Sequence, residues 1–304
     1  MIVDRNIDKE RPSLLKTVVV ILCPAFMWGT GNVITRSLLV EGVNEIFLVT
    51  IRITLVSALM ASYFLLSNKE KVSRRMLKQA ALTGFVSIFV VGWSFIYALQ
   101  HISSGLVTLM VSSAPVFTII WIKILLKEEE VSKLKYIAII TGFMGLAYLF
   151  ITKETGLVDQ GNIYLGGSLA FLGVQAIALG TVLNRKYAPR YKTGTWLAFQ
   201  YPVPVFLSLV IYLASDVGVS SLDSSQRVRL AIIVLFNLGA FYSFTWLIQR
   251  VSAVLVSTID YIVPIIGVTG GVLLLGEAFN TNIVTASLFI FISLVLNTKE
   301  EFSN

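Results

Sequence analysis

The chain has 304 residues, of which 56% are hydrophobic and 13% are charged, and its mean hydropathy is +0.82. Soluble domains contain roughly 45–50% apolar and 25% charged residues, so this composition excludes an ordinary soluble protein and indicates a membrane protein. The net charge of +7 would suit a nucleic-acid-binding protein only if the basic residues clustered on one surface. The distribution of these residues along the chain therefore decides whether the charge indicates nucleic-acid binding.

Apolar runs long enough to cross a bilayer, which takes about 20 residues, follow one another along the whole chain. The links between them are short and leave no room for a separate soluble domain. The charged N-terminal segment is not followed by a cleavage site, so we expect the first apolar run to be a retained helix and not a signal peptide. We predict ten membrane spans, at approximately 17–39, 44–66, 77–99, 103–126, 133–152, 163–187, 194–215, 228–249, 252–275 and 280–297.

The basic residues are distributed unevenly between the two sides of the membrane. If the N-terminus is cytoplasmic, 18 of the 24 Lys and Arg residues fall in segments that face the cytoplasm. This is the asymmetry of the positive-inside rule. We therefore predict a multi-pass protein of the plasma (inner) membrane with both termini in the cytoplasm. Topology then explains the basic charge, and we expect no nucleic-acid partner.

The chain contains an internal duplication. Residues 100–128 return as residues 249–277 without a gap, at an offset of 149 positions, so we take 6–154 and 155–303 as two repeats. Identical pairs at this offset are Gly31/Gly180, Val33/Val182, Arg36/Arg185, Gln100/Gln249, Ser103/Ser252, Leu106/Leu255, Val107/Val256, Pro115/Pro264, Leu125/Leu274, Leu126/Leu275 and Glu128/Glu277.

Each repeat carries five predicted spans, an odd number, so the second repeat enters the membrane in the opposite direction to the first. Inverted repeats place the substrate near the middle of the bilayer, between the two halves, and let one half move against the other. The predicted fold class is therefore an all-α membrane protein with ten transmembrane helices arranged as two inverted five-helix repeats. This arrangement favours alternating access over a static pore.

Polar and aromatic side chains within the spans are the candidates for a substrate path. In the first half they are Trp28 and Asn32 of the first span, and Trp93 and Tyr97, which lie at i and i+4 in the third span. An amide in hydrocarbon needs a partner or a water-filled cavity, which singles out Asn32. Helix packing is the alternative role for the first span, and an aromatic belt at the membrane surface is the alternative for the pair in the third.

The second half offers Gln175 in the sixth span and the pair Tyr242 and Trp246, again at i and i+4, in the eighth. Trp246 is equivalent to Tyr97 at the 149-residue offset, which favours a shared position on the path. Packing is the alternative here too.

Asp260 and Tyr261, just before Pro264, complete the candidate set. Asp260 stands ten residues after Arg250, so at 1.5 Å per residue it lies about 15 Å into the membrane. An acidic residue at that depth indicates function by default, and it would couple transport to protons or bind a cationic substrate group. The structural alternative is a hydrogen bond to a carbonyl freed by the helix break. Arg52 of the second span should face the bundle interior, as an anchor or as a substrate contact.

The chain resembles the EamA family of the drug/metabolite transporter superfamily in Trp28-Gly29, in Arg52 and in the duplicated block with its central proline and terminal glutamate. The resemblance covers nearly the whole chain and implies ten helices, cytoplasmic termini and a cavity bounded mainly by the first, third, fourth, sixth, eighth and ninth helices. Members of the family export amino acids and other small metabolites, while relatives carry nucleotide sugars, S-adenosylmethionine, vitamins or choline. The second repeat departs from the first with Ile177 opposite Trp28 and Tyr201 opposite Arg52.

These observations predict a transporter of small polar or amphipathic metabolites, of the amino-acid exporter type, with protons as a candidate coupling ion. An importer or exchanger of a cationic or nucleotide-like solute is the alternative. An enzyme is disfavoured because the chain has one histidine, one cysteine and no paired acidic motif, and no cofactor or metal is predicted. The expected partners are the substrate and the lipid bilayer.

Overall fold

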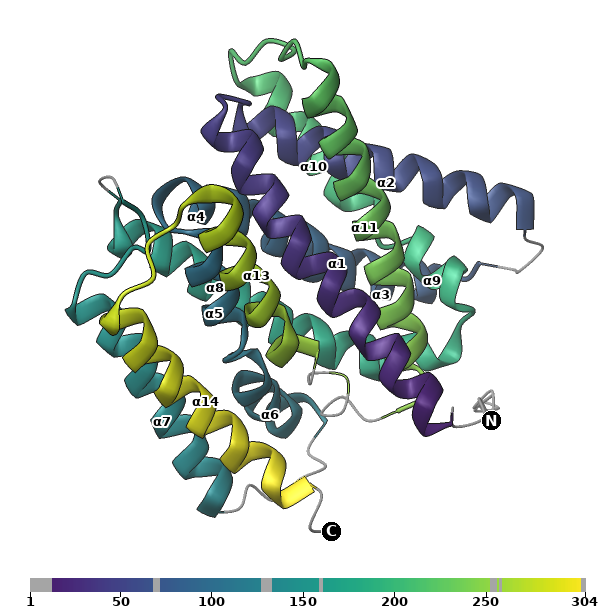
Figure 1. Cartoon of the computed structure of the whole chain (residues 1–304). Coiled ribbons are helices and arrows are strands. Elements are labelled where there is room, and N and C mark those ends of the chain that lie inside the picture. The colour runs from purple at the N-terminus through teal and green to yellow at the C-terminus, as the bar shows by residue number, and fades with distance from the viewer. Residues whose placement is uncertain are drawn as a thin grey trace.

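The computed structural model describes residues 13–67, 72–126, 133–158, 161–251, 256 and 259–301, and every regular element in these ranges is helical (Figure 1). The helices of the first half are α1 (Leu14–Val40), α2 (Glu45–Ser67), α3 (Arg74–Gly84), a π-helical segment (Phe85–Val90), α4 (Val91–His101), α5 (Ser104–Val111), α6 (Ala114–Leu125) and α7 (Lys133–Ile151). Those of the second half are α8 (Ile163–Tyr187), a 3₁₀ turn (Ala188–Arg190), α9 (Thr193–Ala198), α10 (Pro202–Ala214), α11 (Ser224–Ile248), α13 (Ile259–Leu275) and α14 (Thr281–Glu301).

Seven helical segments in the described ranges are long and apolar enough to cross a membrane. They are Val19–Val40, Glu45–Leu66, Arg74–His101, Ser104–Leu125, Ile163–Arg190, Thr193–Ala214 and Ser224–Ile248. The fifth, ninth and tenth predicted spans coincide with shorter apolar helices, Tyr136–Ile151, Ile262–Leu275 and Thr281–Ser293. The chain is thus an all-helical, multi-pass membrane protein, and the count of ten spans stays a prediction.

Two of the predicted spans are interrupted in the middle. The fourth breaks between α5 and α6 at Ser112 and Ser113, one residue before Ala114-Pro115. Proline has no backbone N–H, so Pro115 cannot donate to the carbonyl of Val111 one turn earlier, and the helix is interrupted there. The hydroxyls of the two serines donate to the carbonyls of Leu109 and Met110, at 2.5 and 2.6 Å, in addition to the backbone N–H groups that these carbonyls accept. The seventh span breaks in the same way before Pro202, between α9 and α10.

Contacts between helices recur at equivalent places, so that a pair of helices in contact has a matching pair 149 residues away along the chain. α1 packs along α11 and α13, while the equivalent helix α8 packs along α4 and α6. The pairs α2 with α10 and α7 with α14 each join equivalent helices of the two halves, and α7 and α14 lie side by side in Figure 1. α5 packs on α13, which is the equivalent of α6. The first helix of each half therefore packs against helices of the other half, and both halves bound the centre of the bundle.

One hydrogen bond occurs at the same place in both halves. Arg36 of α1 donates from Nη1 to the carbonyl of Leu99 at the end of α4. At the 149-residue offset, Arg185 of α8 donates from Nη1 to the carbonyl of Ile248 at the end of α11, at 3.1 Å. The free carbonyls at a helix C-terminus favour a cation, which explains why an arginine stands at this position of both repeats.

The glutamate that ends the repeated block has a structural role in the second half. The buried carboxylate of Glu277 accepts hydrogen bonds from the backbone N–H of Ser104 (2.7 Å), the Ser104 hydroxyl (2.9 Å) and the backbone N–H of Gly105 (3.0 Å). These donors lie in the first turn of α5, so Glu277 caps a helix of the other half. The contact ties the end of α13 to the start of α5.

Glu277→Ala is expected to lower the free energy of unfolding by about 3 kcal/mol, because three buried donors lose their acceptor. The apparent melting temperature in detergent, followed by size-exclusion chromatography, measures this loss. Asp216→Ala is the matched control, since Asp216 is exposed. Equal melting temperatures for the two variants would contradict the capping role.

Candidate functional site

A central cavity lies where the two halves meet. Its walls are formed by α1, α2, the π-helical segment with α4, the end of α5, α8, the α9–α10 junction, α11 and α13. It encloses about 130 Å³. One water needs about 10–15 Å³ of such space, so the cavity holds on the order of ten waters, or a ligand with a similar number of non-hydrogen atoms.

The cavity is built largely from equivalent positions of the two repeats. Nine pairs related by the 149-residue offset have both members in its lining. They are Trp28/Ile177, Gly31/Gly180, Asn32/Thr181, Thr35/Asn184, Arg52/Tyr201, Ile88/Asn237, Gly92/Phe241, Phe95/Phe244 and Val111/Asp260. Equivalent positions of the two repeats therefore meet around the cavity, and the differences within each pair make its chemistry asymmetric.

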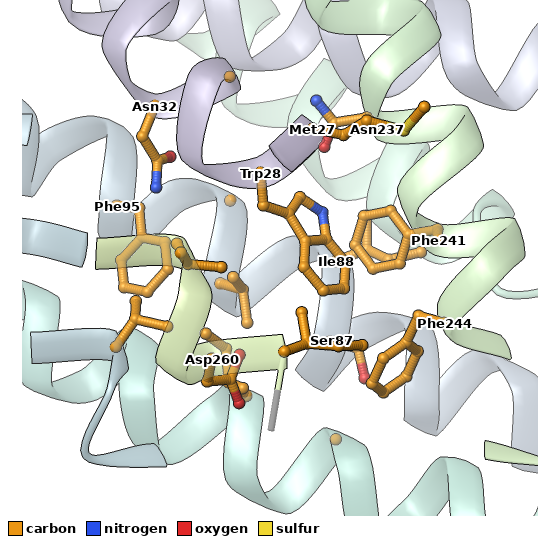
Figure 2. A pocket seen from close by; sticks show the side chains of 18 of the residues that line it. Met27, Trp28, Asn32, Ser87, Ile88, Phe95, Asn237, Phe241, Phe244 and Asp260 are labelled. Atoms are coloured by element: carbon orange, nitrogen blue, oxygen red, sulfur yellow. The ribbon is translucent and has the colours of Figure 1, made fainter. Parts of the chain in front are cut away.

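Aromatic rings form much of its wall. Trp28 of α1 meets Phe241 of α11 edge to face, with ring centroids 5.5 Å apart and planes at 77°. It also contacts Phe244 one turn further, at 5.7 Å and 58°. Figure 2 shows these rings on one side of the view and Phe95 on the other. Such rings bind apolar groups and cations alike.

Polar groups interrupt this apolar wall. Asp260 comes from the first turn of α13 and is 7% exposed, and Asn32 of α1 lies higher in Figure 2. The amide of Asn237 donates to the carbonyl of Ile233 at 2.9 Å, so its oxygen is left for the cavity. Arg52 of α2 is half-buried, and its Nη2 lies against Gly92.

Asn184 lines the cavity but is fully engaged in the protein. Its Nδ2 donates to the carbonyl of Gly180 (2.9 Å) and to the Ser87 hydroxyl (3.4 Å). Its Oδ1 accepts from Nε1 of Trp196 (2.8 Å) and Nε2 of Gln200 (3.3 Å). With its hydrogen-bonding capacity used, Asn184 fixes the break between α9 and α10 against α8.

Three of the nine residues singled out from the sequence, Trp28, Asn32 and Asp260, line this cavity, and the pair in the third span does not. Trp93 donates from Nε1 to the Ser208 hydroxyl of α10 at 2.9 Å, and Tyr97 stacks on it at 5.9 Å. Both rings lie on the face of α4 that packs toward α2 and α10.

The second-half candidates Gln175, Tyr242 and Trp246 also lie outside the lining. Gln175 accepts from Nε1 of Trp121 at 3.4 Å, while its own buried Nε2 has no described partner. Tyr242 packs edge to face on Tyr63. The ring of Trp246 is covered by the Arg250 guanidinium at 4.1 Å and by the Lys16 ammonium at 5.0 Å. The side chain of Tyr261 lies outside the described residues.

Several lining residues carried no signal of their own in the sequence. Phe95, Phe241 and Phe244 look like ordinary residues of apolar helices. Asn237, by contrast, is an amide within the eighth predicted span and carries the same signal as Asn32. The 149-residue offset supplied one usable signal, because it pairs Phe95 with the identical Phe244. Tyr201 was marked only as the departure opposite Arg52, and both residues face the same cavity.

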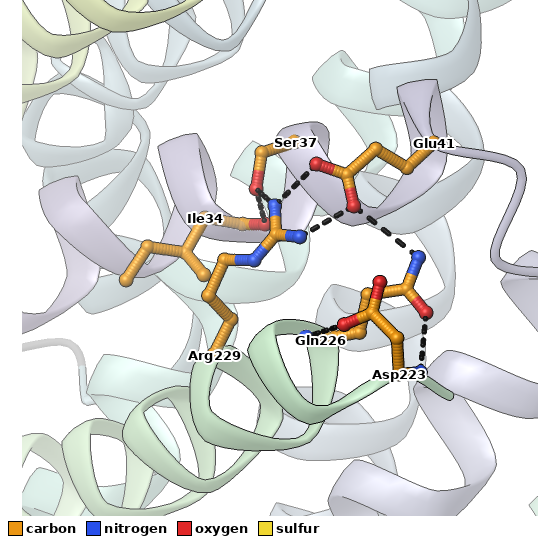
Figure 3. A network of polar contacts seen from close by, with 6 residues as sticks. All are labelled: Ile34, Ser37, Glu41, Asp223, Gln226 and Arg229. Carbon is orange, nitrogen blue, oxygen red and sulfur yellow. Dashed lines mark hydrogen bonds and ion pairs between the residues drawn. The ribbon is translucent and has the colours of Figure 1, made fainter.

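A polar latch joins the two halves where α1 ends and α11 begins (Figure 3). The Arg229 guanidinium forms a two-pronged ion pair with Glu41, through Nη1 to Oε1 (2.7 Å) and Nη2 to Oε2. Nη1 also donates to the Ser37 hydroxyl at 2.9 Å, and Gln226 donates to Glu41 at 3.2 Å. Gln226 itself forms a capping box with Asp223 at the start of α11. The latch therefore fixes the two helix ends to each other.

The Arg229 guanidinium holds the pKa of Glu41 below its ordinary value, chiefly through their hydrogen bond. A lowered folded-state pKa means that the stabilisation is present above the ordinary glutamate range and is lost as the pH falls through the folded-state pKa. We expect the melting temperature of wild type to exceed that of Glu41→Gln modestly at pH 7 and to converge with it as the pH falls through and below the lowered folded-state pKa of Glu41. A gap that is constant with pH would contradict this. The modest size follows from exposure, since the Glu41 side chain is 43% exposed.

Comparison with known proteins agrees with the fold. The model of the EamA-like transporter family matches the chain twice, over residues 15–151 and 164–299. The chain is 24% identical over 295 residues to an "Uncharacterized transporter" of Clostridium kluyveri, covering 93% of each. It is also 24% identical over 257 residues to the "Uncharacterized inner membrane transporter YedA" of Escherichia coli K12, covering 84% of this chain and 81% of that one.

A solved structure titled "Crystal structure of protein" superposes with a TM-score of 0.67 at 17% identity and covers 94% of this chain and 98% of that one, which shows a shared fold. The two family matches together span most of the 304 residues, one in each half. With a multi-pass helical bundle built around a cavity, the chain belongs to the EamA-like transporter family.

Proposed function

We propose that this protein is an alternating-access carrier that exports small polar or amphipathic metabolites of the amino-acid type across the plasma (inner) membrane. One observation carries the proposal: the central cavity is lined by nine pairs of equivalent residues from the two halves. A cavity between two related halves is where a carrier binds its substrate, since movement of one half against the other opens it to each side in turn.

The helix pairing supports the inverted arrangement of the repeats. The contact of α1 with α11 and the contact of α8 with α4 are equivalent at the 149-residue offset. The hydrogen bonds from Arg36 to Leu99 and from Arg185 to Ile248 are equivalent in the same way. Five predicted spans per repeat then make the second half antiparallel to the first. The basic residues on one side and the name of the YedA relative favour the inner membrane, with both termini in the cytoplasm.

Asp260 is the candidate for proton coupling. Its carboxyl lies in the cavity lining, and a carboxyl that faces one side of the membrane and then the other is able to take up and release a proton during the cycle. Uptake driven by a pH gradient in wild type and independent of the gradient in Asp260→Asn would establish this role. Equal responses to the gradient in the two proteins would exclude it.

Reconstitution in proteoliposomes tests the proposed function. We expect saturable, exchangeable uptake of at least one compound from a panel of amino acids, choline, S-adenosylmethionine and nucleotide sugars, measured with and without a pH gradient. Protein-free liposomes are the control. Saturable uptake of a cationic or nucleotide-like solute alone would favour the importer or exchanger, and the absence of uptake for every compound would overturn the proposal.

A further inference from the structure

The third span, formed by α3, the π-helical segment and α4, begins with a cluster of exposed basic side chains. α3 starts with Arg74 and Arg75, Lys78 follows one turn later, and all three are exposed. Within the described ranges, none of the three side chains forms an ion pair or a hydrogen bond. A helix N-terminus disfavours cations, and the first turn of α3 contains no acidic residue to balance them. The three charges are therefore available to an anion from outside the chain.

The same face of the helix continues into exposed apolar residues. At 100° per residue, Leu82 and Phe85 lie within about 60° of Lys78 around the helix axis, as do both arginines. Leu82 is 48% exposed and Phe85 is 39% exposed. The opposite face, with Met76 and Ala80, is buried in the protein. This exposed face is thus charged at its start and apolar beyond it, which is also the order of groups in a phospholipid.

Stacked rings extend the apolar part of this face into the membrane. Phe85 stacks on Phe89, with ring centroids 5.6 Å apart and planes at 18°, and Phe89 contacts Trp93 at 5.8 Å. The row of rings then meets α10, where Trp93 is bonded to Ser208. At 1.5 Å per residue, Phe89 lies about 16 Å beyond Lys78, which is about half of a 30 Å hydrocarbon core. The accessible row of rings therefore has the depth of one leaflet.

The second half does not repeat this combination. The equivalents of Phe85 and Phe89 at the 149-residue offset are Val234 and Leu238, and the equivalent of Arg74 is Asp223. The positive-inside rule explains an excess of basic residues on one side of a membrane. It does not explain why they share one helix face with a row of stacked rings, so insertion into the membrane does not account for the whole pattern.

We infer that this face of the third span binds one anionic phospholipid, with the phosphate on the basic cluster and an acyl chain along the rings. The face consists of Arg74, Arg75, Lys78, Leu82, Phe85 and Phe89, and is called the lipid face below. Arginine and lysine bind phosphate oxygens through charge-assisted hydrogen bonds, and the rings pack on the chain by dispersion. A phosphatidylcholine headgroup adds an ammonium group, which the basic cluster repels. The inference does not depend on what the protein transports.

Native mass spectrometry of the purified full-length protein in a non-ionic detergent tests the inference. The probes are dioleoylphosphatidylglycerol and dioleoylphosphatidylcholine, which have the same acyl chains and differ in net charge. Wild type should bind the first molecule of phosphatidylglycerol at least about tenfold more tightly than phosphatidylcholine. sn-Glycerol 3-phosphate, which has a phosphate and no acyl chain, should bind at least about a hundredfold more weakly than phosphatidylglycerol.

Substitutions of the basic cluster test its role. Arg75→Gln/Lys78→Gln should remove the preference for phosphatidylglycerol, since each basic residue beside an anionic headgroup changes affinity about fivefold. Lys78→Gln alone should lower the preference about fivefold and serves where the double variant does not fold. Lys153→Gln/Arg227→Gln is the matched control, because it also removes two exposed positive charges, both away from the lipid face.

A substitution of the rings tests the apolar part. Phe85→Ala should weaken the binding of both phospholipids by a similar factor and leave their ratio unchanged. Phe291→Ala, which removes an exposed ring of α14, is its control and should bind both phospholipids as wild type does.

Four results would overturn the inference. They are equal affinities of wild type for the two phospholipids, an unchanged preference in the variants of the basic cluster, an equal loss in the matched control, and binding of sn-glycerol 3-phosphate as tight as that of phosphatidylglycerol. The last result would indicate a site for free phosphate compounds and not for a lipid.

Discussion

Gly31→Phe should abolish transport while leaving the protein folded. Gly31 lines the cavity, and a Cβ atom added there meets nothing within 4 Å. A phenyl ring at this position therefore extends into open space and fills the volume that the substrate needs. Since the cavity encloses about 130 Å³, one such ring takes up most of it, and we expect uptake to fall by at least about a hundredfold.

The control for this variant is Gly218→Phe. Gly218 also has open space around its Cβ position, and it lies in the segment between α10 and α11, away from the cavity. Both variants should elute as folded protein, and the uptake rate per folded molecule should drop only for position 31. Normal transport by Gly31→Phe would mean that the substrate does not pass through this cavity.

Gly84→Ala should prevent the protein from folding. Gly84 ends α3, and a Cβ atom there would lie 1.8 Å from the carbonyl oxygen, 2.6 Å from the carbonyl carbon and 2.9 Å from the Cα of Gln200. All three are backbone atoms at the break between α9 and α10, so no side-chain rotation relieves the clash. The expected cost is on the order of 4–5 kcal/mol, which is most of the stability of a typical domain.

Gly31→Ala is the matched control for that variant, because it makes the same substitution in a helix where the added methyl is unobstructed. Alanine is favoured over glycine in a helix by roughly 1 kcal/mol, so this control should be neutral or more stable than wild type. Expression level and melting temperature in detergent are the measurements. A folded Gly84→Ala protein with the wild-type melting temperature would show that α3 and the α9–α10 break are not in contact.

The sequence predicted the helical class and the family, because both depend on strong signals. A composition this apolar has few folds open to it, and a gap-free repeat at 149 positions is readable without any structure. Asp260 stood out as a position of interest, since a carboxyl far from either end of a span differs from its apolar surroundings. Its place in the cavity lining agrees with that interpretation.

The face of each helix that borders the cavity was the part that the sequence did not determine. Trp93 and Tyr97 share one face of α4 by their spacing, and the cavity is on another face, which carries Phe95. Successive residues of a helix are about 100° apart, so side chains two residues apart, such as Trp93 and Phe95, point in nearly opposite directions. In α4 apolar residues lie on all sides, and periodicity does not separate the face toward the cavity from the face toward α10.

The same ambiguity applies to α11, where the rings in the lining are Phe241 and Phe244, and not Tyr242 and Trp246. Tyr242 and Trp246 drew attention as an aromatic pair at i and i+4, yet their rings have neighbours elsewhere. Tyr242 packs on Tyr63, and Trp246 lies under Arg250. The residues of α11 whose rings line the cavity are therefore the phenylalanines Phe241 and Phe244.

The latch between Glu41 and Arg229 has no counterpart on the opposite face of the bundle, because the equivalent positions hold Arg190 and Ala80. In a carrier made of two identical inverted halves, the inward-facing and outward-facing forms would have the same free energy and would be equally populated. A one-sided ion pair removes that degeneracy, and 1 kcal/mol is enough to skew the two populations about fivefold. In the proposed alternating-access carrier, the empty protein would then spend unequal times facing the two compartments, and its apparent affinities for one substrate would differ between the two sides of the membrane.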